Sequence, residues 1–218
     1  ANPAVNVASF TPALAPGSVL SLFGSGLAGE TLVAAAPLPT ELGGSTVTYN
    51  GAALPLYFVA PGQINAQLPF DAASEGTLRV STLSGTADAG VRLAATAPAI
   101  FPSVLLQLNG TLTTAETPVA AGDALIVYMT GLGRVDGDVS PGHATPASPL
   151  LRATAPVEVR FGSVTSDALF AGLAPGFIGV YQVNLAVPAS LPTGSHPLQI
   201  VAGGAASNTV SVPVRSTR

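Results

Sequence analysis

The sequence predicts an all-β protein built from two tandem immunoglobulin-like β-sandwich domains. Glycine and proline supply 24 and 20 of the 218 residues, and this density breaks helices because proline removes a backbone donor and glycine costs entropy. Turn signals recur about every ten residues between short alternating segments, which is typical of a β-sandwich. The third observation is an internal repeat, which indicates that the fold occurs twice.

The repeat is centred on a Pro-Gly turn that leads into an amide-rich strand. V-A-P-G-Q-I-N-A-Q-L-P at Val59–Pro69 returns as L-A-P-G at Leu173–Gly176 and Q-V-N-L-A-V-P at Gln182–Pro188. Amides alternate with apolar residues in both copies, which predicts a strand with one polar and one buried face. We therefore expect two domains, residues 1–98 and residues 99–218, each large enough for its own core.

The first elements of the two copies also correspond. An alternating segment with Val5 and Val7 on one face, bounded by prolines, predicts an edge strand. Ala15–Leu27 then aligns without gaps with Ala120–Leu132, and five of these thirteen positions are identical. Each copy thus contains a strand that enters from a glycine turn and leaves through Gly-Leu.

Hairpin turns are expected at matching places, at Asn50-Gly51 and Ser84-Gly85 in the first copy and at Gly162-Ser163 and Gly203-Gly204 in the second. Asn-Gly is the strongest of these signals because both residues tolerate positive φ. Ala95–Pro102 is too rich in proline for a central strand and is predicted to be the junction between the domains. Asn109-Gly110 predicts a further hairpin that opens the second domain.

The inward positions of the alternating strands define two expected cores. They are Leu20, Leu22, Val47, Ile64, Leu68, Leu78 and Val80 in the first domain, and Leu125, Val127, Val157, Val159, Val183, Leu185, Leu198 and Ile200 in the second.

Charge excludes several classes of partner. The chain has seven arginines, no lysine and eleven acidic residues, for a net charge of −4. We expect no nucleic-acid partner, because such a partner would require clustered positive charge. The uncharged span Ala168–Val214 is interrupted by proline and glycine, so no membrane-spanning helix is expected. Low charge fits an extracellular or cell-surface protein, whose signal peptide would already have been removed.

The sequence offers little for catalysis, and we expect a non-enzymatic protein without cofactor or metal. A nucleophilic triad needs a histidine held by a carboxylate near serine or cysteine, yet His143 and His196 lie in proline-rich surroundings and no G-x-S-x-G motif occurs. Without cysteine, two histidines make a poor transition-metal set. Asp136-Gly137-Asp138 fits either a calcium loop or a polar turn, and the lack of further nearby carboxylates favours the turn.

Amides and aromatic residues provide candidate binding loops for a surface glycan or a protein, and these are Gln63, Asn65, Phe177, Tyr181, Gln182 and Asn184. In an alternative interpretation, the amides lie on a solvated sheet face or hold the adjacent Pro-Gly loop, and the aromatic residues belong to the core or to a domain interface. The chain contains no tryptophan, the residue that a carbohydrate platform would favour.

P-G-S-V-L-S-L-F-G-S-G-L, A-P-G-Q-I-N-A-Q-L-P, Y-M-T-G-L-G and F-A-G-L-A-P-G-F-I-G-V-Y-Q-V-N-L-A-V-P resemble the Solibacter-type C-terminal domain, a module of secreted acidobacterial proteins. The segment entering F-G-S-G-L also looks like the IPT/TIG type of immunoglobulin-like sandwich. The resemblance covers nearly the whole chain. It implies an extracellular pair of sandwiches in an exported bacterial protein and carries over no catalytic residues.

Self-association is the function we expect, as the subunit of a surface fibre or layer. Exposed strand edges recruit other strands unless charge, especially lysine, blocks them, and this chain has no lysine. The candidate strands are the alternating terminal ones, with Val5 and Val7 at one end and Val210, Val212 and Val214 at the other. Pairing between subunits would use main-chain hydrogen bonds, and a contact that does not close makes a filament. A glycan- or protein-binding adhesion module is the alternative.

Overall fold

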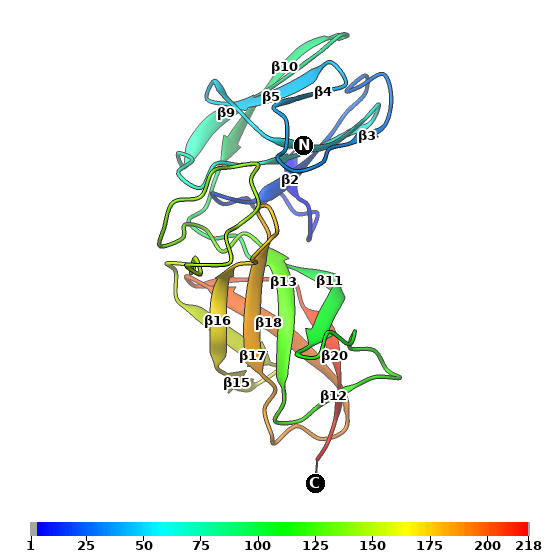
Figure 1. The fold of residues 1–218 in the computed structure, drawn as a ribbon, viewed down its shortest axis with the longest axis vertical. Coiled ribbons are helices and arrows are strands. Elements are labelled where there is room, and N and C mark those ends of the chain that lie inside the picture. The colour runs from blue at the N-terminus through cyan, green and yellow to red at the C-terminus, as the bar shows by residue number, and fades with distance from the viewer. Residues whose placement is uncertain (1–3, 218) are drawn as a thin grey trace.

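The computed structural model describes residues 4–217, so the outermost residues of the two predicted domains, 1–3 and 218, lie outside the described residues. Twenty strands and no helix form within residues 4–217. The strands build two sandwiches stacked along the long axis of the molecule (Figure 1). The predicted all-β fold of two tandem immunoglobulin-like sandwiches is confirmed. In the described part of the chain, no helix has the length and apolar character needed to cross a bilayer.

The first sandwich contains two antiparallel sheets. One has the order β1 (Ala4–Asn6), β2 (Val19–Phe23), β8 (Gln63–Gln67), β7 (Leu56–Ala60) and β3 (Leu32–Val33). The other has the order β10 (Gly85–Arg92), β9 (Glu75–Thr82), β5 (Ser45–Tyr49) and β4 (Glu41–Leu42), with β6 (Ala52–Ala53) paired to β5.

The second sandwich also contains two sheets, in which all strand pairs but one are antiparallel. Its first sheet has the order β11 (Ala99–Gln107), β13 (Ala124–Thr130), β17 (Tyr181–Ala186) and β16 (Ala168–Leu173). Its other sheet has the order β12 (Val119–Ala120), β20 (Val210–Arg215), β18 (Gly194–Ala202), β14 (Val157–Phe161) and β15 (Val164–Ser166), with β19 (Ala205–Ala206) paired to β18.

Both halves therefore share one strand order, as the repeat predicts. The order β1-β2-β8-β7 corresponds to β11-β13-β17-β16, and β10-β9-β5 corresponds to β20-β18-β14. The register agrees with the gapless alignment, because Leu22 pairs with Ile64 in the first half and Val127 pairs with Val183 in the second. The exact boundary between residues 98 and 99 stays a prediction.

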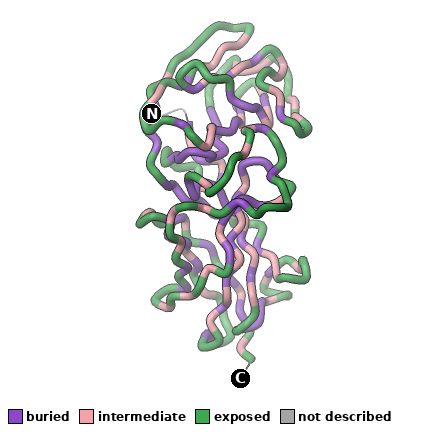
Figure 2. The backbone as a smooth tube through the Cα atoms, turned by 60° about the vertical axis from the view of Figure 1, so that its left-hand side comes forward, coloured by how far each residue is buried: buried purple, intermediate pink, exposed green. Residues whose placement is uncertain are grey.

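Each sandwich has its own apolar core. The buried residues appear as purple segments of the tube in both halves of Figure 2. The predicted core residues are buried, except that Val80 and Val157 are half-buried and pack against the rim of their cores. The largest side chains that are fully buried include Leu20 and Ile64 in the first core and Leu125 and Met129 in the second. Burial of such side chains from both sheets holds a sandwich together.

The turns follow the sequence signals closely. Asn50 and Gly51 both have positive φ, at 50° and 85°, and connect β5 to β6 as a two-residue hairpin of the expected kind. The prediction at Ser84-Gly85 is one residue off, because Thr82 pairs with Gly85 and the loop consists of Leu83 and Ser84.

The junction differs from the prediction at its C-terminal end. Ala99–Pro102 begins strand β11 and is not linker, and Pro102 is tolerated because β11 is an edge strand with a register shift between Ile100 and Leu105. The true connection is shorter and is held by hydrogen bonds. Ala97 N donates to Gly131 O at 2.8 Å, and Thr96 Oγ1 donates to Ala202 O at 2.7 Å.

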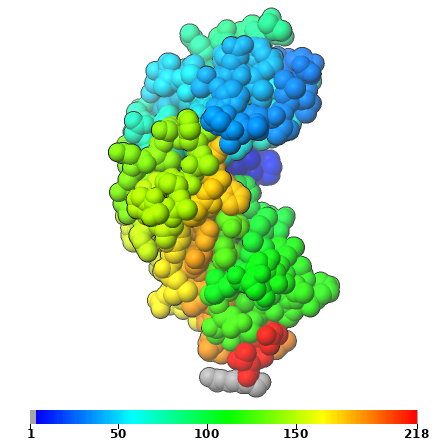
Figure 3. All heavy atoms as spheres, in the orientation of Figure 1, coloured from blue at the N-terminus to red at the C-terminus, as the bar shows by residue number. Residues whose placement is uncertain are grey.

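A long loop of the second sandwich, residues 131–156, also reaches the first sandwich (Figures 1 and 3). Leu38 N donates to Gly142 O at 2.8 Å, and Gly142 N donates to Gln67 Oε1 at 2.7 Å. Tyr57 Oη of the first sandwich also donates to Ile178 O of the second. The two sandwiches therefore meet over a wide, hydrogen-bonded contact.

Candidate functional site

The predicted amides form the same contact in both sandwiches. Gln63 Nε2 donates to Asn65 Oδ1 at 2.7 Å, and Gln182 Nε2 donates to Asn184 Oδ1 at 2.7 Å. Ser21 Oγ adds a second hydrogen bond to Asn65 at 2.9 Å. The amides thus bond to one another along their own strand, and their outer surfaces remain half-exposed. Ligand binding by these residues stays a prediction.

An aromatic pair with at least one exposed ring accompanies each amide pair. Tyr128 lies opposite Gln182 in the β13–β17 pair, and its ring centroid is 5.4 Å from that of Phe177, which is 49% exposed. In the first sandwich, Phe23 lies opposite Gln63 and its centroid is 6.5 Å from that of Phe10. We call these two groups the amide-aromatic patches.

Tyr181 does not belong to a binding loop, which corrects the sequence-based expectation. Its side chain is fully buried where the sandwiches meet, and its hydroxyl donates to Gly133 O. The ring lies edge-on to Phe70 of the first sandwich, with centroids 6.4 Å apart. Burial raises the pKa of the Tyr181 hydroxyl above the ordinary value, and burial has the same effect on the pKa of Tyr57. Both tyrosines are structural residues of the junction.

The terminal valines occupy different environments from those expected. Val5 of the edge strand β1 and Val7 just after it are half-buried, and the described residues of β1 that pair with β2 are Ala4 to Asn6. Val210, Val212 and Val214 point into the second core. β20 is not a free edge at its C-terminal end, because β12 pairs with Val214 and Arg215. The expectation of an open C-terminal strand is therefore wrong at that end.

A different strand presents a long open edge. β10 pairs with β9 over eight consecutive residues without a register shift, contains no proline, and forms the outer limit of its sheet at the end of the molecule farthest from the C-terminus (Figure 1). Thr82 and Gly85 close a two-residue hairpin, so alternate residues from Thr86 to Arg92 direct their backbone groups away from β9. This edge is about 26 Å long at 3.3 Å per residue.

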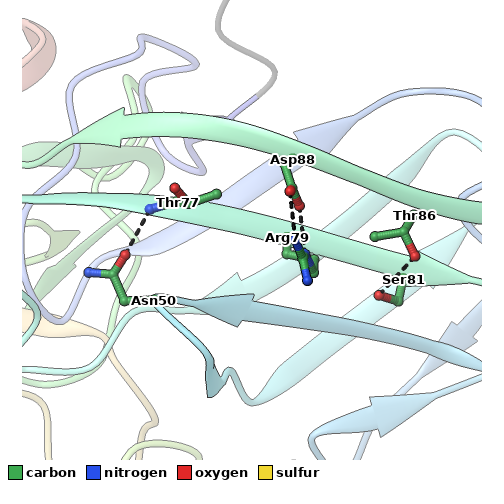
Figure 4. A network of polar contacts seen from close by, with 6 residues as sticks. All are labelled: Asn50, Thr77, Arg79, Ser81, Thr86 and Asp88. Carbon is green, nitrogen blue, oxygen red and sulfur yellow. Dashed lines mark hydrogen bonds and ion pairs between the residues drawn. The ribbon is translucent and has the colours of Figure 1, made fainter.

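Polar side chains hold the β9–β10 hairpin in register on its outer face (Figure 4). Arg79 donates two hydrogen bonds of 2.8 Å to the carboxylate of Asp88, its direct cross-strand neighbour. Thr86 Oγ1 donates to Ser81 Oγ at 3.4 Å. The hydrogen bonds from Arg79 lower the pKa of the Asp88 carboxyl, and Asp88 raises the pKa of Arg79. The two charges neutralise each other, so the edge carries little net charge that would repel a strand.

An apolar cleft lies beside this edge. Its volume is about 360 Å³, and it lies between the end of β2 with the following Gly-rich turn and the β9–β10 hairpin. The lining includes Leu22, Gly24, Leu78, Val80 and Ala89. We call it the edge cleft. Exposed Phe23 also lines the cleft, and its ring lies beside that of Phe10.

The acidic turn and the histidines have structural partners. Asp136 Oδ1 accepts a hydrogen bond of 2.7 Å from Arg152 N, which fixes the turn, and residues 4–217 contain no group of three or more metal-ligating side chains. Asp136 therefore belongs to a hydrogen-bonded polar turn. His143 contacts Pro141 O at 3.2 Å and His196 contacts Pro192 O at 2.8 Å, so neither ring is oriented by a carboxylate.

Two features escaped the sequence-based reasoning, the β10 edge and the edge cleft. A signal for the cleft was present in the gapless alignment, where Gly24 stands at the position of Met129. Loss of a large apolar side chain from an otherwise matching strand indicates a gap in the core. No comparable signal marked β10, because edge position depends on which strands pair.

No family model and no curated protein matches the chain. Among solved structures, SGBP-B from a complex xyloglucan utilization locus in Bacteroides uniformis is 16% identical, with 92% of this chain and 45% of that chain covered and a TM-score of 0.31. SGBP-B from the mixed-linkage glucan utilization locus of Bacteroides ovatus, in complex with a mixed-linkage heptasaccharide, is 12% identical, with 94% and 43% covered and a TM-score of 0.37. Domains 5–6 of the S-layer protein SbsC are 13% identical, with 100% and 98% covered and a TM-score of 0.29.

The chain thus spans less than half the length of these two glycan-utilization proteins. At such identities and scores the likeness carries no information about function, which has to be inferred from the chain's own residues.

Proposed function

We propose that the chain is a non-enzymatic structural module of the cell surface that self-associates by strand pairing, with β10 of the first sandwich as the joint. The observation that carries this proposal is the continuous, proline-free and unshifted edge of β10. Such an edge offers a row of main-chain donors and acceptors to a strand of another subunit. The proposal moves the joint from the terminal strands to β10.

Other long edges are less suitable for pairing. β11 contains Pro102 and a register shift, and both features interrupt a ladder. β16 has a register shift between Ala168 and Phe170, and Gly172 is already bridged to Arg152. These features leave β10 as the longest uninterrupted edge among the described residues.

An extracellular location and membership of the Solibacter-type C-terminal domains complete the proposal. The low content of charged residues, 8%, supports the location, and the repeat motifs support the family membership. A compact pair of sandwiches, joined by hydrogen bonds at the connection and at the loop of residues 131–156, suits a load-bearing subunit.

Gly90 gives a direct test of the β10 joint. Its backbone nitrogen points toward the open side, and a Cβ added there meets nothing within 4 Å. Gly90→Pro removes the donor from the edge, whereas Gly90→Ala keeps it and serves as the matched control. Light scattering and electron micrographs over a concentration series should show assemblies for the wild type and for Gly90→Ala, and monomers for Gly90→Pro. A wild type that stays monomeric at high concentration contradicts the proposal, as does unchanged assembly of Gly90→Pro.

Glycan binding is the second candidate function, and the amide-aromatic patches favour it. In each sandwich an amide pair lies beside an aromatic pair with at least one exposed ring. This combination of hydrogen-bonding groups and flat apolar surface suits a sugar ring. The binding residues would be Phe177, Gln182 and Asn184 in the second sandwich, with Gln63 and Asn65 in the first.

A glycan array with the wild type, followed by Phe177→Ala, tests this candidate. Leu150→Ala is the matched control, because Leu150 and Phe177 have similar exposure, 47% and 49%. Specific signal that Phe177→Ala removes and Leu150→Ala retains supports glycan binding. An array without specific signal, or signal that both variants retain, rules this patch out.

A further inference from the structure

The open edge of β10 has two defined ends. At one end a two-residue loop, residues 83 and 84, joins the strand to β9. Beyond the other end Ala94 N donates to Leu14 O at 2.9 Å, so a segment of the same sandwich already covers the chain there. Between these ends, the residues whose backbone groups point away from β9 are Thr86, Asp88, Gly90 and Arg92. A partner strand therefore has four residues of β10 to pair with.

The other strands at sheet edges are short or irregular in the described part of the chain. β3, β4 and β12 contain two residues each, and β1 and β15 contain three. β11 and β16 are longer, but each has a register shift. Among the described edges, the strand that matches β10 over its whole length is therefore β10 of a second copy.

Two β10 strands fit one another in antiparallel orientation at one register. With Ala89 opposite Ala89 of the second copy, Asp88 lies opposite Gly90 and Thr86 lies opposite Arg92. All four outward residues of each strand then exchange main-chain hydrogen bonds with the other copy. A shift of two residues in either direction leaves one of the four outward residues in each strand without a partner.

The inner side chains of β10 are small enough to meet at this register. Ala87 lies opposite Val91 of the second copy, and Ala89 lies opposite itself. These are non-hydrogen-bonded pairs, in which side chains approach most closely, and each pair contains an alanine. Ala87 is exposed and Ala89 is half-buried in the single chain, so pairing would remove apolar surface from water.

The charges on the outer face of β10 are complementary across the two copies. Arg92 of one copy lies diagonally next to Asp88 of the other, which a long side chain can reach, and Gly90 opposite Asp88 leaves the intervening space open. Arg79 of β9 pairs with Asp88 at 2.8 Å (Figure 4). Glu75 of β9 pairs with Arg92 at 2.8 Å. The contact would thus join four charges of alternating sign, whereas the register that sets Asp88 opposite Asp88 brings like charges together.

We propose that the strand bound by β10 is β10 of a second copy, in antiparallel orientation about a two-fold axis at Ala89. This inference rests on the proposed function, because it names the partner of the β10 joint. The sheet of β4, β5, β9 and β10 would continue into the same sheet of the second copy. A two-fold contact closes on itself, so this joint yields a dimer, and a larger assembly needs a second contact elsewhere on the surface.

Cysteine cross-linking tests the pairing, because the chain has no cysteine of its own. Ala89→Cys places two thiols at the axis, with Cα atoms about 4.5 Å apart in a non-hydrogen-bonded pair, a separation that a disulfide can bridge. Mild oxidation should convert this variant to a covalent dimer on non-reducing gels. Ala87→Cys is the matched control on the same face of the strand. It lies about 13 Å along the strand from its own copy and should stay monomeric on the gel.

Gly90→Cys distinguishes the registers. A Cβ at this position meets nothing within 4 Å, so the variant should fold, and melting temperatures close to that of the wild type check this for all three variants. In a pairing shifted by two residues, Gly90 would lie opposite itself. Stronger cross-linking of Gly90→Cys or Ala87→Cys than of Ala89→Cys overturns the proposal, as does the absence of cross-linking in all three.

A charge swap tests the same contact without a covalent bond. Arg92→Glu and Asp88→Arg each place like charges side by side across the axis, and each should raise the dissociation constant of the dimer at least about tenfold in analytical ultracentrifugation. A mixture of the two variants restores opposite charges at both places and should form a heterodimer with nearly wild-type affinity. Variants that stay as weakly associated in the mixture as they are alone contradict the proposal.

These experiments separate the self-pairing of β10 from the proposed function. Assembly that Gly90→Pro abolishes, combined with no cross-linking of Ala89→Cys, would support β10 as the joint and overturn its pairing with itself. A wild type that stays monomeric at high concentration would overturn both.

Discussion

Gln67 Oε1 accepts a hydrogen bond from the backbone nitrogen of Gly142 at 2.7 Å, which ties the amide strand of the first sandwich to the long loop of the second. Gln67 is 1% exposed, unlike Gln63 on the same strand, which lies half-exposed beside Asn65. Two amides of one alternating row therefore have different roles. One stabilises the junction, and the other belongs to an amide-aromatic patch.

Replacement of Gln67 by alanine should destabilise the protein by about 1–3 kcal/mol, because it leaves the buried nitrogen of Gly142 without an acceptor. Gln63→Ala removes an amide from the same strand without exposing a buried partner and should change the free energy of unfolding much less. Urea denaturation of both variants measures the difference. Equal losses would show that the bond to Gly142 adds nothing to the junction.

Tyr181→Phe should lower the free energy of unfolding by about 1 kcal/mol, because the buried hydroxyl and Gly133 O lose their hydrogen bond while the ring still packs. The raised pKa of Tyr181 also predicts a dependence on pH. An unfolded tyrosine ionises near the ordinary value of 10.0, whereas the folded one keeps its proton, so the contribution is complete below this pH and is lost above it.

Denaturation at a series of alkaline pH values therefore gives the check on Tyr181. Wild-type stability should fall as pH rises above about 10, and Tyr181→Phe should fall less steeply. Part of the slope should remain in the variant, because burial also raises the pKa of Tyr57. Identical slopes for the two proteins would argue against a buried, protonated Tyr181.

Gly131 and Gly26 occupy equivalent turns of the two sandwiches, with φ of 83° and 67°. A Cβ on Gly131 would lie 1.9 Å from Ala97 O of the connecting segment, whereas on Gly26 its nearest neighbour would be Ser84 Oγ at 3.3 Å. Both alanine variants should lose about 1–2 kcal/mol through the left-handed backbone, and Gly131→Ala should lose more because the connection must move. Comparable melting temperatures for the two variants would indicate that the connection is loosely docked.

Much of the fold follows from local sequence signals. Alternation in Q-I-N-A-Q and Q-V-N-L-A identified β8 and β17 with their buried faces, because the period of a strand is fixed by its geometry. Asn50-Gly51 identified a hairpin because few other residues accept positive φ at both positions. The repeat then supplied the common strand order, which local signals alone do not contain.

The site was harder to predict because it depends on contacts between distant segments. Tyr181 follows a Pro-Gly loop in the sequence, yet it lies on the inner face of β17 with Val183 and Leu185, and its ring also lies against Phe70 of the first sandwich. Val214 looks like part of a free terminal strand until β12, distant in sequence, pairs with it. Prolines in Ala99–Pro102 suggested a linker, yet an edge strand tolerates them.

The docking of the connecting segment has a mechanical consequence. Ala94 N donates to Leu14 O at 2.9 Å and Ala97 N donates to Gly131 O at 2.8 Å. The connecting segment is therefore attached to the first sandwich near its start and to the second near its end. A pull applied to the two ends of the molecule would have to detach these bonds before the distance between the sandwiches could grow. Tension would thus pass directly from one sandwich to the next, and the molecule would lengthen only after the hydrogen bonds of the connecting segment had broken.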